Sequence, residues 1–175
     1  MKEILVAVDL QNDFIDEALG TPEAVAIVDN AVEKILSYRG KKVYATMDTH
    51  GENYMETAEG RHLPVPHCIR GTHGWLLNDR IAAALGEVGA EIVEKPTFGS
   101  LDLAEKITEY ADGENVNVEL IGLCTDICVI SNALMIKANL YESEVSVDPA
   151  CCAGVTPATH DAALTTMQMC QINIA

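Results

Sequence analysis

The stretch GLCTDICV, residues 122–129, places two thiols four residues apart, with a glycine before them and a Thr-Asp pair between them. Three kinds of chemistry use such a pair: a metal clip, a disulfide, or one reactive cysteine at the start of a helix. A structural zinc site normally adds a second spaced pair of ligands, whereas Cys151 and Cys152 are adjacent. The spacing therefore favours a single reactive cysteine over a thiol-bound zinc.

Cys128 is the better placed of the two thiols for covalent chemistry. It falls just inside a predicted helix that starts near Thr125, where the first-turn N–H groups and the helix dipole lower the pKa of a thiol. Lys95 and Asp9 end two other predicted strands, so a cation and a proton acceptor are available as well. Nucleophile, base and cation are the parts of covalent acyl transfer, and backbone N–H groups of the turn 123–128 can hold an oxyanion. Taken singly, each residue has a plainer interpretation: a core cysteine, a loop-capping acid or a solvated lysine.

A second group of residues has the composition of a metal site. Asp48 and His50 lie two residues apart at the end of a predicted strand and therefore project to the same side of it. His67 follows in a histidine-rich loop, and a carboxylate with imidazoles suits zinc, manganese or iron(II). Any one of these histidines is by itself more typical of a solvated loop residue, and His62 and His73 keep that interpretation.

The elements that position these residues alternate between strands and helices. That alternation predicts an α/β fold with a doubly wound, mostly parallel six-stranded sheet and helices on both faces. Sites in such sheets gather at the carboxyl ends of the strands, where the residues above converge. The segment 49–74 has little periodicity, and a loop of that length is typically functional or disordered. Strands are predicted at 3–9, 41–48, 90–95, 116–123, 142–148 and 172–175, and helices at about 22–39, 75–87, 101–111, 125–138 and 157–170.

Length and composition bound the kinds of protein to consider. The 175 residues predict a single domain spanning 1–175, and apolar residues at 49% are enough for a sizeable core. The net charge of −16 argues against a nucleic-acid or anionic-membrane partner. The short apolar run at the amino terminus is not a signal-peptide core, and no stretch approaches the length of a membrane span. We therefore expect a cytoplasmic protein whose six cysteines are reduced thiols rather than a disulfide framework.

The motifs together resemble a known family. The sequences DLQNDF (9–14), EK (94–95), GLCTDICV (122–129), DPACCAGVTP (148–157) and HD (160–161) look like those of the isochorismatase-like cysteine hydrolases, and the nicotinamidase branch is nearest in pattern. The resemblance runs nearly end to end. In order and spacing, the motifs are very specific for the family and less specific for a substrate.

The resemblance implies a role for each of the catalytic candidates. It implies Cys128 as nucleophile, Asp9 as general base and then acid, and Lys95 as the charge that holds the thiolate. It also implies a cis peptide between Leu123 and Cys124, and an oxyanion hole formed by the backbone amides of Cys124 and Cys128.

The same resemblance implies a divalent metal, with zinc favoured and manganese or iron as alternatives. Its ligands are expected to be Asp48, His50 and His67, with Glu59 as a candidate fourth ligand and Glu56 as the competitor for that place.

The chain departs from the nicotinamidase pattern beside this metal site. Thr49 and the run 64–66 (PVP) stand where nicotinamidases usually carry an aromatic residue and a Trp-Pro. Phe14 and Phe98 are the remaining candidate walls for a substrate ring.

We therefore expect a metal-assisted cysteine amidohydrolase that converts a small carboxamide, such as nicotinamide, to an acid and ammonia through a Cys128 thioester. One alternative is a relative that acts on another C–N bond, as in a ureido or carbamoyl compound. The non-enzyme alternative is a metal- or thiol-binding module. By analogy with relatives, the chain is expected to form a homo-oligomer.

Overall fold

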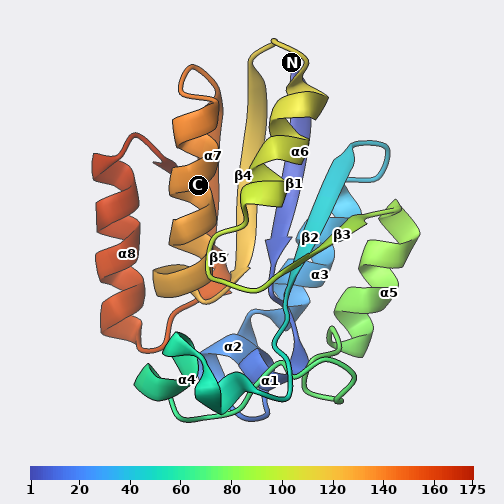
Figure 1. Cartoon of the computed structure of the whole chain (residues 1–175). Helices are drawn as coiled ribbons and strands as arrows, with labels where there is room; N and C mark the ends of the chain where they lie inside the picture. Colours follow the sequence, from blue (N-terminus) through green and yellow to red (C-terminus); the bar gives the residue numbers. More distant parts are fainter.

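The computed structural model describes residues 1–175. They contain one six-stranded sheet, in which every neighbouring pair of strands is parallel. The strand order is β3-β2-β1-β4-β5-β6 (Figure 1). The α/β, doubly wound prediction is therefore confirmed. The strands are β1 (Lys2–Val8), β2 (Lys42–Asp48), β3 (Glu91–Lys95), β4 (Val116–Leu123), β5 (Glu144–Ala153) and β6 (Asn173–Ile174).

Helices cover both faces of this sheet. The helices α3 and α5 lie on one face, and α6, α7 and α8 lie on the other, while the short helices α1, α2 and α4 gather beyond the carboxyl ends of the strands (Figure 1). The helices are α1 (Asn12–Ile15), α2 (Pro22–Ala26), α3 (Val28–Ser37), η1 (Tyr54–Glu56), α4 (Ala58–His62), α5 (Asp79–Val88), α6 (Leu101–Ala111), the π-helical turn η2 (Thr125–Val129), α7 (Ile130–Asn139) and α8 (Pro157–Met169).

The continuous apolar run of β1 reflects burial on both faces. Leu5 and Ala7 point into the core beneath α3 and α5, whereas Ile4, Val6 and Val8 point into the core beneath α6, α7 and α8. Successive side chains of a strand alternate between faces. A central strand whose two faces are both covered by helices is therefore apolar at successive positions.

The direction of winding reverses between β1 and β4. From β1 the chain winds outward to β2 and β3 on one side, and from β4 it winds to β5 and β6 on the other. Ligands of open α/β sheets bind in the crevice at such a switch point. Asp9 follows β1 and the GLCTDICV turn leaves β4, so the two segments with the most suggestive chemistry meet there.

Several predicted boundaries were wrong. The helix expected over about 22–39 is two helices, because the chain breaks at Ile27 between α2 and α3. The helix expected from residue 75 begins at Asp79, where the Asn78 side chain caps it by accepting from the N–H of Arg80. The loop 49–74 contains η1 and α4, and α1 was not predicted at all. Each of these three helices is too short to show a helical period.

Gly122 lets β4 approach β1 at the switch point. Its φ is +116°, and an added Cβ would lie 2.1 Å from the carbonyl oxygen of Val8. A side chain here would push apart the two strands that carry Asp9 and the cysteine turn.

We therefore expect Gly122→Ala to lower the free energy of unfolding by at least about 2 kcal/mol, because it adds a backbone clash to an unfavourable φ. Gly86→Ala is the matched control: nothing lies within 4 Å of its Cβ position, in an exposed part of α5, so it should stabilise by roughly 0.5–1 kcal/mol. Urea unfolding of both variants measures the difference, and equal midpoints would contradict the close-approach argument.

Candidate active site

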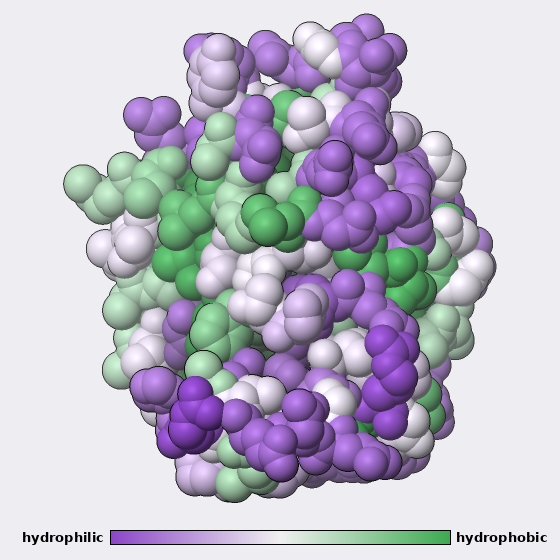
Figure 2. Space-filling view, viewed as in Figure 1, coloured by the Kyte–Doolittle hydropathy of each residue, from purple (hydrophilic) through white to green (hydrophobic).

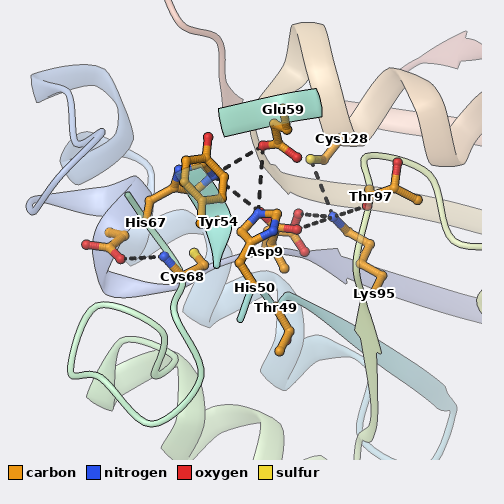
Figure 3. Close-up of polar contacts among 12 residues, drawn as sticks. Asp9, Thr49, His50, Tyr54, Glu59, His67, Cys68, Lys95, Thr97 and Cys128 are labelled. Atoms are coloured by element: carbon orange, nitrogen blue, oxygen red, sulfur yellow. Dashed lines mark hydrogen bonds and ion pairs between the residues drawn. The ribbon is translucent and has the colours of Figure 1, made fainter. Parts of the chain in front are cut away.

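Lys95 brings together the three catalytic candidates of the sequence. Its Nζ lies 2.6 Å from Oδ2 of Asp9 and 3.5 Å from Sγ of Cys128, and it donates to the carbonyl oxygen of Thr97 at 2.9 Å (Figure 3). Only 1% of Lys95 and 4% of Cys128 is exposed, and Asp9 is fully buried. Residues from β1, β3 and the turn after β4 therefore meet around one buried ammonium.

The carboxylate of Asp9 is held from its other side by β2. Thr46 Oγ1 donates to Oδ1 of Asp9 at 2.6 Å, and the backbone N–H of Asp9 donates to the carbonyl oxygen of Thr46 at 3.2 Å. Asp9 has a φ of +47°, a conformation that non-glycine residues adopt uncommonly. These contacts fix which carboxylate oxygen faces Thr46 and which faces Lys95.

Burial and mutual charge set the proton affinities of the three groups. Burial raises the pKa of Asp9, and the Lys95 ammonium opposes that rise. Burial lowers the pKa of Lys95, but Asp9, Cys128 and Asp48 outweigh it and the net direction is upward. Lys95 is therefore a cation, which stabilises a negative charge on either of its two acidic neighbours.

The predicted lowering of the Cys128 pKa was wrong for this environment. Burial raises the pKa of the thiol well above its usual range, the Asp9 carboxylate raises it further, and Lys95 acts in the opposite direction. The helix-terminus argument did not include burial, which has the largest effect on the thiol. The resting nucleophile is therefore a thiol that has to pass its proton to a base.

The turn that carries Cys128 is tied to its surroundings by backbone and amide contacts. The peptide between Leu123 and Cys124 is cis, and the carbonyl oxygen of Cys124 accepts from the N–H groups of Ile127 and Val129. Asn132 donates from Nδ2 to the carbonyl oxygen of Cys128 at 2.8 Å. The position of the thiol is thus set by β4 on one side and by α7 on the other.

A second cluster, formed by Asp48, His50, Glu59 and His67, lies beside the ammonium. One ligand atom from each residue lies within 4.8 Å of all the others. His50 Nε2 is 3.0 Å from Oδ2 of Asp48. Oε1 of Glu59 is 3.5 Å from Nε2 of His67 (Figure 3). Oδ1 of Asp48 lies 3.7 Å from Nζ of Lys95, so the two clusters adjoin.

This donor set fits a divalent cation. Two imidazoles and two carboxylates are ligands that zinc accepts. Oδ1 of Asp48 is buried without a hydrogen-bond partner, and the Nδ1–H of His67 donates to the carbonyl oxygen of Val65 at 2.8 Å, which turns Nε2 toward the cluster. A second hydrogen bond of this kind commonly orients a metal-binding histidine. Glu59 of α4 belongs to the group, whereas the competing candidate Glu56 is exposed and outside it.

Electrostatics supports the same interpretation of the cluster. Burial alone raises the pKa of Asp48, but the hydrogen bonds from His50 and His67 and the charge of Lys95 lower it overall. Burial lowers the pKa of His67, yet Asp48 and Glu59 outweigh it and raise the value to about 10. The two carboxylates therefore attract positive charge strongly to this position.

One cavity connects the two clusters. It has a volume of about 850 Å³ and is lined by Cys124, Cys128, the four residues of the metal-ligand cluster and both predicted aromatic walls, Phe14 and Phe98. The ring of Phe14 also packs edge-on against His67, with ring centres 5.5 Å apart. The histidines given a plain interpretation lie outside the cluster: His73 pairs with Glu17 at the surface, and His62 lies at the cavity rim.

Sequence reasoning missed three residues that hold the site together. Thr46 was hidden inside a strand pattern, and Asn132 inside a helix pattern. Gln11 donates from Nε2 to the carbonyl oxygen of Asp48 at 2.9 Å and accepts from its N–H through Oε1 at 2.7 Å. A glutamine two residues after the predicted strand 3–9 was the one available signal, because an amide that becomes buried there needs partners on neighbouring segments.

A doubly wound α/β domain with a buried cysteine, acid and lysine beside a metal-type cluster defines a class of cysteine hydrolase. The sequence model of the isochorismatase domain matches residues 3–174, and the chain therefore belongs to the isochorismatase family. An uncharacterised isochorismatase-family protein of Bacillus subtilis, PncA, is 31% identical over 146 residues, which cover 77% of this chain and 78% of that protein.

Solved structures agree with the family assignment. The nicotinamidase/pyrazinamidase PncA from Bacillus subtilis is 26% identical with a TM-score of 0.87, and the match covers 100% of both chains. The pyrazinamidase of Pyrococcus horikoshii in complex with zinc is 28% identical with a TM-score of 0.79, and the match covers 100% of this chain and 99% of the other.

None of the helices in the structure has the length and apolar character needed to cross a membrane.

The cluster predicts metal uptake that depends on each of its members. His67→Ala and Glu59→Gln should each lower zinc affinity by at least about tenfold, because each removes a ligand or its charge. His73→Ala and Glu56→Gln are the matched controls and should bind as the parent chain does. Zinc titration against a competing chelator measures the four affinities, and an unchanged His67→Ala variant would refute the site.

Proposed function

We propose that this chain is a metal-dependent amidohydrolase that cleaves the C–N bond of a small carboxamide, with nicotinamide hydrolysis to nicotinate and ammonia as its reference reaction. The contact of Lys95 with both Asp9 and Cys128 carries the proposal, because it joins a nucleophile to a base around one fixed cation. Family membership and the likeness to a nicotinamidase/pyrazinamidase and to a zinc-bound pyrazinamidase support it.

The first half-reaction uses the proton affinities of the site. Asp9 takes the proton of the Cys128 thiol, and the thiolate attacks the carboxamide carbon to form a C–S bond. Lys95 remains charged, so it stabilises the anion both before and after this proton moves. The backbone amides of Cys124 and Cys128 are the proposed donors to the oxyanion. The tetrahedral adduct then expels ammonia, which leaves with the proton that Asp9 has stored.

The second half-reaction reverses the role of Asp9. The carboxylate, now unprotonated again, takes a proton from water as the water oxygen attacks the thioester carbon. Breaking the C–S bond returns the proton to sulfur and releases the carboxylic acid. Lys95 faces the sulfur as it leaves, so the ammonium stabilises the negative charge that forms there until the proton arrives.

Asp48, His50, Glu59 and His67 are the proposed ligands of the metal, most simply zinc. A bound dication supplies a Lewis acid for a ring nitrogen or other heteroatom of the substrate, or for water. The ligands line the same cavity as Cys128, so a substrate held there keeps its carboxamide near the thiol. Self-association and a cytoplasmic location stay predictions.

The reference reaction is tested by ammonia release from nicotinamide with the zinc-loaded protein. Turnover should be lost in Cys128→Ala and retained in Cys170→Ala, whose thiol is exposed and far from the catalytic turn in sequence. Turnover of ureido or carbamoyl compounds in place of every carboxamide would favour the related C–N hydrolase. Zinc binding without any turnover would favour a binding module.

The variant Asp9→Asn separates two effects of the Asp9 carboxylate: proton transfer during turnover, and the electrostatic rise of the Cys128 pKa. Turnover should fall at least about 10²–10⁴-fold, because the site loses its general base and acid. Alkylation of Cys128 by iodoacetamide at neutral pH should become faster, because the charge that raises the pKa of the thiol is gone while Lys95 remains. Mass spectrometry of the labelled peptides follows the second effect.

The exposed carboxylate of Asp102 supplies the control, and Asp102→Asn should change neither quantity. An Asp9→Asn protein that turns over normally, or that is alkylated more slowly than the parent chain, would refute the assigned base.

A further inference from the structure

The cavity extends well beyond the room that one pyridine ring needs. Its volume of about 850 Å³ is near the upper end of the range of about 300–1,000 Å³ that is typical of pockets for much larger, drug-sized ligands. Asp48, His50, His67 and Cys128 are buried and line its inner end, whereas four apolar side chains that are partly or largely exposed line its outer part: Leu19, Leu63, Phe98 and Val155.

These four side chains come from four separate segments. Leu19 follows α1, Leu63 follows α4, Phe98 follows β3 and Val155 follows β5. Leu63, Phe98 and Val155 are 38%, 42% and 52% exposed, so each presents apolar surface to solvent. Figure 2 shows how apolar side chains lie among hydrophilic ones on one face of the molecule. Apolar groups that converge on one catalytic cavity are stabilised when an apolar ligand covers them.

The charge of the cavity excludes a different class of substrate. No lysine or arginine lines it, and Lys95 is buried behind it against Asp9. Asp48 and Glu59 would balance the charge of a dication held between them, so the inner end offers no surplus positive charge. The one imidazole at the rim is His62, whose Nδ1–H donates to the carbonyl oxygen of Ala58. A substrate with a distal carboxylate would therefore lack a fixed cationic partner.

We infer that the preferred substrates are neutral carboxamides whose acyl part carries an extended apolar group, seated against Leu19, Leu63, Phe98 and Val155 while the amide faces Cys128. This inference rests on the proposed amidohydrolase function and adds the class of the acyl group. The occupant of the outer cavity is thus part of the substrate, continuous with the carbonyl carbon that becomes the thioester.

The experiment compares butanamide, hexanamide and octanamide with nicotinamide and adipamate, using the zinc-loaded protein. Adipamate is hexanamide with a carboxylate in place of its terminal methyl group. We expect kcat/KM to rise about fourfold per added methylene until the outer cavity is filled. Adipamate should be at least about a hundredfold poorer than hexanamide, because its charge would be buried unpaired.

Two variants locate the effect. Leu63→Ala should lower the ratio of kcat/KM for octanamide over butanamide by about three- to tenfold. Met55→Ala is the matched control, because Met55 is exposed in the same segment but does not line the cavity, and its ratio should stay at the parent value.

Calorimetry with Cys128→Ala keeps the two proposals distinguishable, because it measures binding of the intact amides without turnover. Tighter binding along the series together with ammonia release supports both proposals. Tighter binding without ammonia release from any amide would overturn the proposed function and leave the acyl preference standing. Hydrolysis of nicotinamide with a flat alkyl series, or equal use of adipamate and hexanamide, would overturn the inference alone.

Discussion

The buried ion pair between Lys95 and Asp9 is the interaction on which the rest of the site depends. Removing an ammonium and a carboxylate from water is costly, and their attraction repays the cost only when the remaining donors and acceptors are satisfied. Here the carbonyl oxygen of Thr97 accepts from the ammonium, and the hydroxyl of Thr46 donates to the carboxylate. Losing one partner from such a pair typically costs about 3–5 kcal/mol, because the other charge stays buried. The pair therefore constrains β1, β2 and β3 to one relative position at their carboxyl ends.

The pair also explains why the cysteine is protonated at rest. Lys95 offers one positive charge to two acids, and the carboxylate is the nearer of them, at 2.6 Å against 3.5 Å for the sulfur. Burial then disfavours a second negative charge in the same place. A single proton is thus shared between oxygen and sulfur, and catalysis consists of moving it from one to the other and back.

Local sequence patterns predict much of this architecture. The apolar run of β1 predicts a buried parallel strand, and Thr156-Pro157 predicts the start of α8, which begins at Pro157 as expected. The pairing of Asp48 with His50 follows from the two-residue period of a strand. Local patterns do not predict which residue a buried polar group will bind. Thr46 and Gln11 act on segments 37 residues away, and Asn132 joins Cys128, four residues before it, to Ser100, 32 residues before it. No periodicity marks these three residues. The predicted lowering of the Cys128 pKa was wrong for a similar reason, since burial is a property of the assembled core.

Asn132 has a consequence for how this scaffold can change its substrate. Its amide donates to the carbonyl oxygens of Phe98 and Cys128 and accepts from the N–H of Ser100, so one side of the cavity is mechanically coupled to the nucleophile. Val155 belongs to the coupled part as well, because its N–H donates to the carboxylate of Asp126 in the turn that carries Cys128. The hydrogen bonds of Leu63, by contrast, stay within residues 54–65. Substitutions at Leu63 can reshape the cavity while the reacting atoms keep their places. The cavity wall therefore has two parts. One part is coupled to the nucleophile and has to be kept if the reaction is to be kept, and the other part is free to diverge.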